Sequence, residues 1–237
     1  MRLSARVLAI FALLVFPGCT EVTAPTTAPL TLFVTSVDVP LGEQVALGGA
    51  QLCQTDTANC APSRPDGQAS IKLPIGEETS VTLEKDEHAS YLVPVLIPSA
   101  EGVNNPFEMF TDEHMVVQFD RVMSDYPMRG TGAILIVLSP SFEGATFRLV
   151  NATSEPFYTD EEGLWSTTLT ETRKGRLRQV NGGFVNVTPG DEYWVQFGGE
   201  AKNCSTSWGW PGDDQNRFKV PVREGYMSNL RVVCPRP

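Results

Sequence analysis

Apolar and polar residues alternate along several short segments of the chain. In residues 70–73, 80–83 and 193–197, large apolar side chains recur at every second position. A period of two places such side chains on one face of a β-strand. Turn sequences such as Pro65-Asp66-Gly67 separate these segments. Short strands at this spacing predict a mainly β protein built from antiparallel sandwiches.

Two segments have denser apolar runs than the rest. Tyr91–Ile97 and Ala133–Leu138 contain few polar residues. A strand that is apolar on both sides is typical of one covered on both faces. We therefore expect these two strands to be buried on both faces or to lie at a contact between domains.

One segment follows a helical period instead. Between Thr111 and Met123 the apolar positions lie on one face of a helix. Thr111 is a suitable N-cap, and the acidic residues after it suit the positive end of the helix dipole. The pattern predicts one amphipathic helix over 111–123, joining two β-sandwich domains. The apolar residues of this face are Met115, Val116, Phe119, Val122 and Met123.

The two β regions share an order of turns and strands. Each has a Gly-Ala pair at the start of a strand (Gly49-Ala50 and Gly144-Ala145), an acidic turn with glycine, a strand, and a Pro-Gly type turn. We expect these last turns to begin hairpins. The order resembles the carboxypeptidase regulatory-like domains, which are transthyretin-like (prealbumin-like) or Ig-like β-sandwiches, over Leu30–Pro98 and Ala133–Cys234. The resemblance implies exported modules without catalytic residues that serve as structural or binding units.

The N-terminus has the order of an export signal. Arg2 and Arg6 precede an apolar run from Val7 to Phe16, and Cys19 follows shortly after. The run is too short for a permanent membrane span. It resembles a bacterial lipoprotein signal, which implies cleavage after residue 18 and a lipid on Cys19 that holds the protein on a membrane. Ordinary secretion with cleavage elsewhere is the alternative.

The leader and the patterns above predict a domain organisation. Residues 1–18 are the signal peptide, and 19–30 are the lipidated cysteine with a tether rich in threonine and proline. The first β-sandwich domain spans 31–98, the connector with the helix spans 99–131, and the second domain spans 132–237. Because Thr20 is not the aspartate associated with retention in the inner membrane, the lipoprotein resemblance implies the outer membrane, on its periplasmic or its surface side.

The cysteine count is odd. If Cys19 is acylated, four cysteines remain, and they allow three disulfide connectivities. We favour Cys53–Cys60 and Cys204–Cys234 because each pair lies within one predicted domain. Free buried thiols are the alternative; a zinc site is disfavoured, because the chain has no Cys-x-x-Cys spacing and only two histidines.

The mature chain is acidic. The net charge of the whole sequence is −10, and loss of two arginines with the leader takes it from −10 to −12. This balance argues against nucleic acid as a partner, since phosphate binding needs a basic surface.

No segment carries a catalytic signature. The only histidines are His88, in a turn, and His114, at the start of the predicted helix, and no nucleophile motif accompanies them. The acidic stretches 160–162 and 213–216 could bind calcium or could simply be exposed turns. We therefore expect no enzyme, no cofactor and no metal site.

One loop has a composition suited to ligand binding. In CSTSWGWPGDD, Trp208 and Trp210 flank a glycine. In an extended chain both indoles would face the same way and could stack on a sugar or peptide; alternatively they belong to the core. The sequence predicts a membrane-anchored envelope lipoprotein acting as a structural or protein-interaction module. The alternatives are a carbohydrate-binding surface lipoprotein and an envelope hydrolase. The protein or polysaccharide partner and the oligomeric state are left open.

Overall fold

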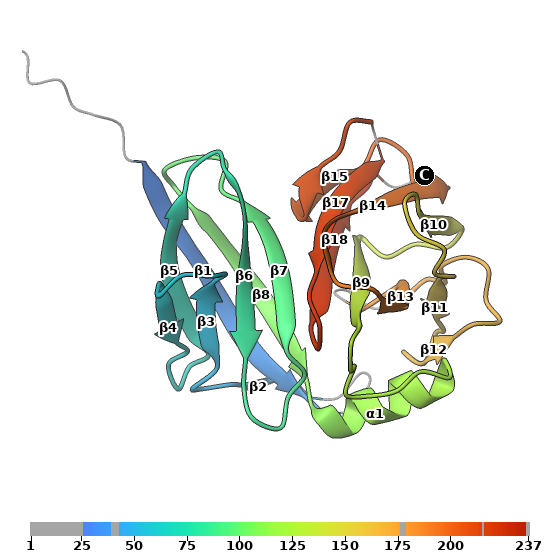
Figure 1. Cartoon of the computed structure of the whole chain (residues 1–237), viewed down its shortest axis with the longest axis horizontal. Coiled ribbons are helices and arrows are strands. Elements are labelled where there is room, and N and C mark those ends of the chain that lie inside the picture. The colour runs from blue at the N-terminus through green and yellow to red at the C-terminus, as the bar shows by residue number, and fades with distance from the viewer. Residues whose placement is uncertain (1–25, 39–42, 176–178, 215, 236–237) are drawn as a thin grey trace, which may run out of the picture.

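β-Strands make up most of the molecule, as the alternation predicts (Figure 1). The structure is a computed structural model that describes residues 26–38, 43–175, 179–214 and 216–235. The predicted leader, Cys19 and most of the tether lie outside these residues. The strands are β1 (Thr27–Val37), β2 (Val45–Ala46), β3 (Gln51–Gln54), β4 (Cys60–Pro62), β5 (Gln68–Pro74), β6 (Glu78–Glu84), β7 (Tyr91–Leu96), β8 (Val103–Phe110), β9 (Gly132–Ser139), β10 (Ala145–Leu149), β11 (Phe157–Thr159), β12 (Trp165–Ser166), β13 (Gly182–Val187), β14 (Gly190–Gly199), β15 (Ser205–Trp208), β16 (Trp210–Pro211), β17 (Arg217–Val222) and β18 (Met227–Val233).

The first half of the fold, residues 26–110, is a two-sheet sandwich. One sheet contains β5, β1 and β8, with β2 on the end of β1, and the other has the order β4-β3-β6-β7. The alternating apolar residues of both sheets point inward and exclude water from the space between them. Its fully or almost fully buried residues include Leu30, Leu32, Leu52, Leu73, Val81, Leu83, Val93 and Phe107.

The second half, residues 132–235, repeats this pairing scheme. β9 pairs with β13 antiparallel and with β18 parallel, as β1 pairs with β5 and β8. β14 lies between β10 and β17, as β6 lies between β3 and β7. The internal repeat read from the turns is therefore present in the strand pairing. The division of the chain at the predicted domain boundaries stays a prediction.

The Pro-Gly turns have a different role from the one expected. β5 and β6 do not pair with each other, and neither do β13 and β14. Each turn instead carries the chain from one sheet of a sandwich to the other. The first turn does lead into a hairpin, because β6 pairs antiparallel with the next strand, β7. The prediction was wrong at the second turn, where β14 pairs with β10 and β17 and not with the strand that follows it. Turn residues specify a reversal of direction and not the sheet in which the next strand pairs.

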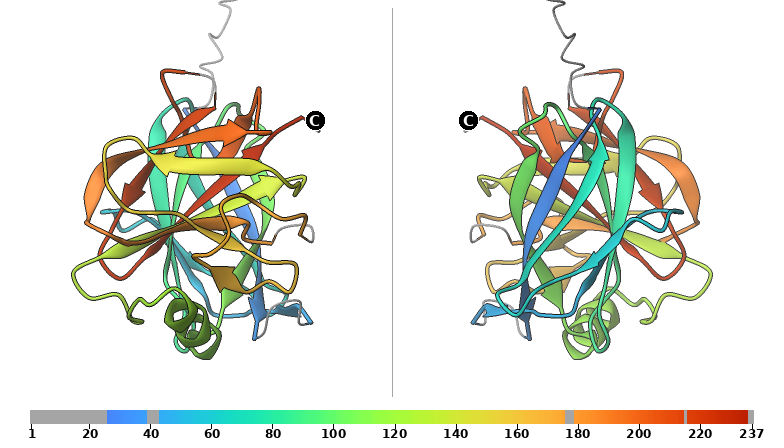
Figure 2. Two further views of the ribbon diagram at one scale, coloured as in Figure 1. Left: turned by 90° about the vertical axis from the view of Figure 1, so that its right-hand side faces the viewer. Right: turned by 90° about the vertical axis from the view of Figure 1, so that its left-hand side faces the viewer.

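One sheet runs through both halves. Its order is β12-β11-β13-β9-β18-β7-β6-β3-β4, and the joint is the parallel pairing of Met227 with Tyr91 and Ser228 with Leu92. β9 is buried on both faces, which confirms the expectation from its apolar run. Its odd-numbered residues 133–137 pack in the core cluster shared with the first half, and its even-numbered residues 134–138 pack in the core of the second half. Figure 2 shows the two halves from opposite sides.

The helix is present, slightly shorter than predicted. α1 spans Asp112–Arg121, and the side chain of Thr111 accepts a hydrogen bond from the His114 backbone N–H as the expected N-cap. The buried face contains Met115 and Phe119, as predicted, together with His114 and Gln118. Val116 is 52% exposed and Met123, beyond the helix end, is 85% exposed. The prediction that Val116 and Met123 lie on the buried face was wrong. His114 and Gln118 lie on that face instead, and Gln118 bonds to the second half.

Candidate functional site

The two tryptophans singled out by the sequence do not share a surface. Trp208 is 1% exposed and lies in the core, where its ring packs against Phe107 with centroids 5.0 Å apart. The guanidinium of Arg231 lies 4.3 Å from its ring centroid. With its amide turned to satisfy both neighbours, Asn105 accepts a hydrogen bond from Trp208 Nε1 at 3.1 Å. Trp208 is therefore a core residue at the contact between the halves, as the alternative interpretation held.

Gly209 explains why the extended-chain assumption fails. Its φ of +130° is a conformation that residues with a side chain rarely adopt. A Cβ there would lie 2.4 Å from a methyl carbon of Leu230. The chain therefore bends between β15 and β16, so that Trp208 and Trp210 enter different surroundings. The rule that residues two apart face the same way holds only within a regular strand.

Trp210 is partly exposed and joins the two halves. Its indole N–H donates to the carbonyl oxygens of Thr79 at 3.0 Å and Val95 at 3.3 Å. The neighbouring Gly209 N–H donates to the carbonyl of Pro94 at 2.9 Å. This loop thus supplies donors to strands β6 and β7 of the first half.

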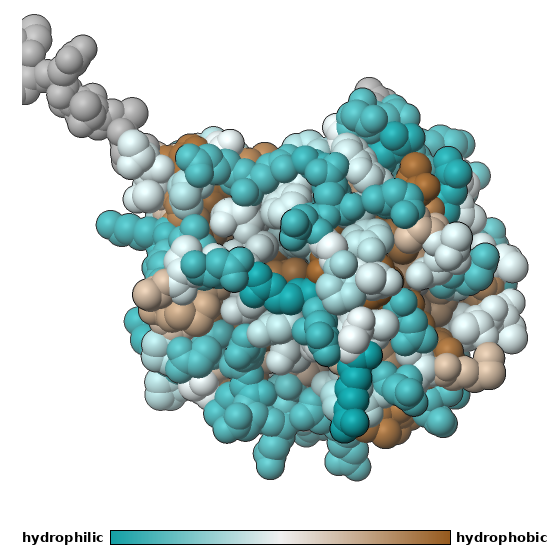
Figure 3. All heavy atoms as spheres, in the orientation of Figure 1, coloured by the Kyte–Doolittle hydropathy of each residue, from teal (hydrophilic) through white to brown (hydrophobic). Residues whose placement is uncertain are grey.

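Polar pairs extend this contact along the seam between the halves. Lys219 Nζ lies 2.7 Å from a carboxylate oxygen of Glu78, and Arg223 pairs with Asp56 at 2.9 Å. Tyr226 donates a hydrogen bond to Glu84. Burial, followed by this carboxylate, raises the pKa of Tyr226 to about 12. Figure 3 shows hydrophilic side chains over most of this view, with hydrophobic residues visible between the halves.

A cleft lies at one end of this seam. Its volume is about 850 Å³. The first half contributes Val103 and Asn105, and the second half contributes Ser207 and the turn after Trp210. The walls are mainly apolar, with Asp213 and Arg217 at the rim; these two are paired at 3.0 Å. A cleft of this kind suits binding through shape and a few polar contacts.

The cleft lies at the end of the molecule where the described chain begins. Leu30, near the start of β1, pairs with Val103 of the cleft wall. Ile75, next to the first residues of β1, pairs with Ile97, which directly precedes Pro98 of the wall. The first residue that the structure describes therefore lies beside the cleft.

Both predicted disulfides are present. Cys53 bonds to Cys60 across β3 and β4, and Cys204 bonds to Cys234 beside the cleft. The local connectivity was therefore correct, and the free-thiol alternative was not.

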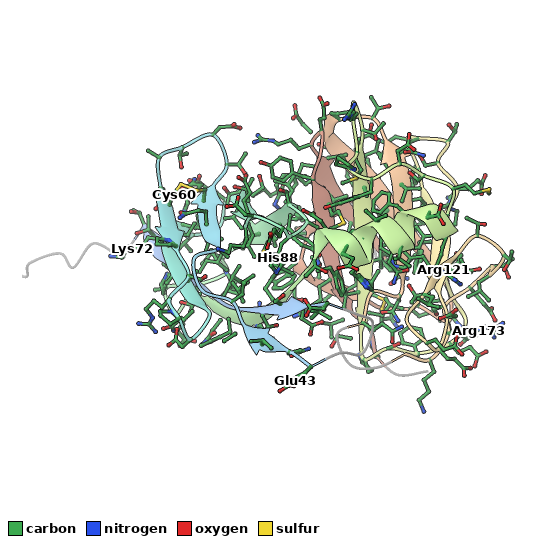
Figure 4. The ribbon with its side chains drawn as sticks, turned by 90° about the horizontal axis from the view of Figure 1, so that it is seen from below. Glu43, Cys60, Lys72, His88, Arg121 and Arg173 are labelled. Carbon is green, nitrogen blue, oxygen red and sulfur yellow. A yellow bond between two sulfur atoms is a disulfide. The ribbon has the colours of Figure 1, made fainter. Side chains whose placement is uncertain are left out.

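The histidines have structural partners. His88 Nε2 lies 2.8 Å from Ser36 Oγ. Figure 4 shows His88 near the start of α1. His114 is buried against the Phe110 ring, and burial lowers its pKa to about 4. Gln118 Nε2 lies 3.2 Å from His114 Nε2 and donates to the Gly163 carbonyl at 3.1 Å. These contacts tie α1 to the second half rather than forming a nucleophile–base pair.

The acidic stretches also have local partners. One oxygen of Asp160 accepts hydrogen bonds from the N–H groups of Glu162 and Leu164, and its carboxylate faces Arg121, which Figure 4 labels at the far end of α1. Both oxygens of Asp213 accept from Arg217. Among the residues that the structure describes, no cluster of histidine, cysteine or carboxylate groups is arranged to hold a metal ion.

Sequence reasoning missed one arrangement of partly exposed residues. Trp194 and Trp210 lie on either side of Lys219, on neighbouring strands of one sheet. The alternation in β14 already directed Trp194 to the face opposite the core. Its pairing with residues more than twenty positions away could not be read from the sequence.

Comparison with known proteins gives distant similarities only. No protein-family model and no curated protein matches this chain. Among solved structures, the minor pilin GBS52 of Streptococcus agalactiae is 12% identical, with a TM-score of 0.26 over 89% of this chain and 98% of that one. The shaft pilin SpaA of Lactobacillus rhamnosus GG is 11% identical (TM-score 0.26, 90% and 99% covered), and the Bacillus anthracis TIE protein is 12% identical (TM-score 0.26, 89% and 34% covered). Structural similarity at these TM-scores gives no information about function. The resemblance to carboxypeptidase regulatory-like domains stays a prediction.

Proposed function

We propose that the protein is a membrane-tethered, non-catalytic interaction module of the bacterial cell envelope. The observation that carries the proposal is the union of the two halves. They share one sheet and one core cluster, and the Trp210 hydrogen bonds and polar pairs close the seam. Two halves joined in this way form one block, in which the surfaces of both halves keep fixed positions relative to each other. Such a block is suited to binding a partner or to holding partners apart.

The position of the tether determines which end of the protein carries the membrane attachment. Within the described ranges, no helix is long and apolar enough to cross a bilayer. The proposal places attachment in the leader region, through a lipid on Cys19. Because the described chain begins beside the cleft, the attachment point lies at the cleft end of the fold and not at the α1 end.

Two measurements on the full chain in a bacterial host test the proposal. A palmitate analogue should label the wild-type protein and not Cys19→Ser. A photo-crosslinking amino acid at Ser207, in the cleft wall, should give discrete adducts, whereas the same group at exposed Val45, on β2 near α1, should not. An unlabelled wild-type protein would remove the anchor, and equal crosslinking at both positions would remove the cleft as the binding surface.

A further inference from the structure

The sheet β10-β14-β17-β16 has one face covered by the core of the second half and one face that the first half covers only in part, at Trp210 and Lys219. Val195, Phe218 and Val220 point into the core of the second half. Because side chains alternate along a strand, Trp194 and Lys219 project from the opposite face, and both are partly exposed. The residues on this outer face are named below as the aromatic–cationic face: Arg148, Val150, Trp194, Gln196, Trp210, Arg217 and Lys219.

Its central row crosses three strands. Lys219 is the cross-strand partner of both Trp194 and Trp210. Its ammonium nitrogen lies 5.8 Å from the ring centroid of Trp194 and 5.9 Å from that of Trp210. Two strand spacings separate the tryptophans, which places their backbones about 10 Å apart. This spacing is comparable to the length of a disaccharide unit in an extended glycan.

A second row lies beside the first. Arg148 pairs with Gln196, and Gln196 pairs with Arg217. Arg217 Nε donates to Gln196 Oε1 at 3.0 Å, and exposed Arg148 continues the row on the edge strand β10. Three cationic side chains therefore lie on one face of a chain whose net charge is −10.

Contacts with the first half fix two side chains of this face before any ligand arrives. Trp210 is held through its indole N–H by two carbonyls of the first half. Glu78 holds the Lys219 ammonium, and the side chain of Lys219 is only 16% exposed. Ordering these groups in advance reduces the entropy that binding would otherwise cost.

We propose that the aromatic–cationic face binds a linear polysaccharide that carries carboxylate groups. Sugar rings stack on the two indoles, while exposed Arg148 attracts the carboxylates. Lys219 and Arg217 add positive charge beside it, although Glu78 and Asp213 partly compensate them. The inference rests on the proposed function, since it names a partner class for the interaction module. It moves the predicted carbohydrate surface from the Trp208–Trp210 pair to Trp194 and Trp210.

The test uses the purified full-length protein in detergent and isothermal titration calorimetry. The probes are alginate and hyaluronate, which carry uronate groups, and cellohexaose, which is neutral. The uronate polymers should bind, with an affinity that falls as salt is added. Trp194→Ala should weaken binding about tenfold, through loss of one stacking surface, and Lys219→Gln should weaken binding and reduce its salt dependence.

Two variants serve as controls. Phe33→Ala removes a 40% exposed aromatic ring from β1 in the other half and should bind like the wild type. Arg148→Gln alters only an exposed side chain, so it tests the face even if Trp194→Ala fails to fold. Absence of binding to both uronate polymers, equal binding of cellohexaose, or wild-type binding by both Trp194→Ala and Arg148→Gln would overturn the inference. Labelling at Cys19 and crosslinking in the cleft do not depend on this result, so the two proposals can fail separately.

Discussion

Acid should loosen the attachment of α1 to the second half through His114. The amide nitrogen of Gln118 can only donate, so the facing Nε2 of His114 must accept and carry no proton. Gln118 also donates to the Gly163 carbonyl and accepts from the Trp165 N–H at 2.9 Å. A proton on His114 Nε2 would place its N–H against the N–H group of Gln118 in a buried site. The two donors would repel each other, and the hydrogen bonds by which Gln118 joins α1 to the second half would weaken.

The size of the effect follows from the pKa of the ring. Burial lowers the pKa of His114 from its ordinary 6.5 to about 4. The folded state therefore binds fewer protons than the unfolded state between these values, and stability is lost as the pH falls from 6.5 toward 4. Allowing for partial access of solvent to the ring, the free energy of unfolding should fall by about 1–2 kcal/mol between pH 8 and pH 5 because of this residue alone.

Urea unfolding followed by circular dichroism at pH 8, 6.5 and 5 measures this effect. The informative quantity is the difference between wild type and His114→Gln, because titration of the carboxylates cancels in it. That difference should change by about 1–2 kcal/mol in favour of the variant as the pH falls. Val116→Gln, at an exposed position of the same helix, is the control and should keep the wild-type acid dependence. A difference between wild type and His114→Gln that stays constant from pH 8 to pH 5 would refute the reasoning.

Three other perturbations have defined outcomes. Trp210→Phe leaves two carbonyls of the first half without their donor and should lower the free energy of urea unfolding by about 1–2 kcal/mol; an unchanged midpoint would show that water replaces the indole. Replacing both Cys53 and Cys60 by alanine opens a short loop and should cost about 2–3 kcal/mol in the same assay, and reducing agent should destabilise the variant less than the wild type, because only Cys204–Cys234 is left to reduce. Gly67→Ala places a methyl group 2.3 Å from the Val34 carbonyl oxygen at a φ of +82°, so its thermal midpoint should fall by several degrees; a wild-type midpoint would contradict this close approach of the turn to β1.

Local patterns in the sequence predicted the elements of the fold well. The alternation at 70–73 and 80–83 became β5 and β6, and the apolar run from Ala133 became β9. Thr111 caps α1 as expected. These predictions depend on residues close together in the chain, where side-chain period and capping chemistry act directly.

Features that depend on distant residues were harder to predict. Val116 follows the helical period yet is exposed, because Gln118 is drawn inward by partners more than forty residues away. Trp208 was expected beside Trp210, but one glycine between them changes the direction of the chain. The candidate surface formed by Trp194 and Lys219 arises from strand register, and period alone does not fix which strands become neighbours.

Trp210 connects the stability of the block with the proposed binding face. Its indole N–H holds the first half, while Lys219, near its ring, pairs with Glu78 of the same half. The geometry of the face therefore depends on closure of the seam. A ligand that binds only the closed form stabilises it according to its concentration relative to its dissociation constant. A saturating uronate polymer should accordingly raise the unfolding midpoint of the wild type. It should do so less for Trp210→Phe, in which the ring remains but its attachment to the first half is lost.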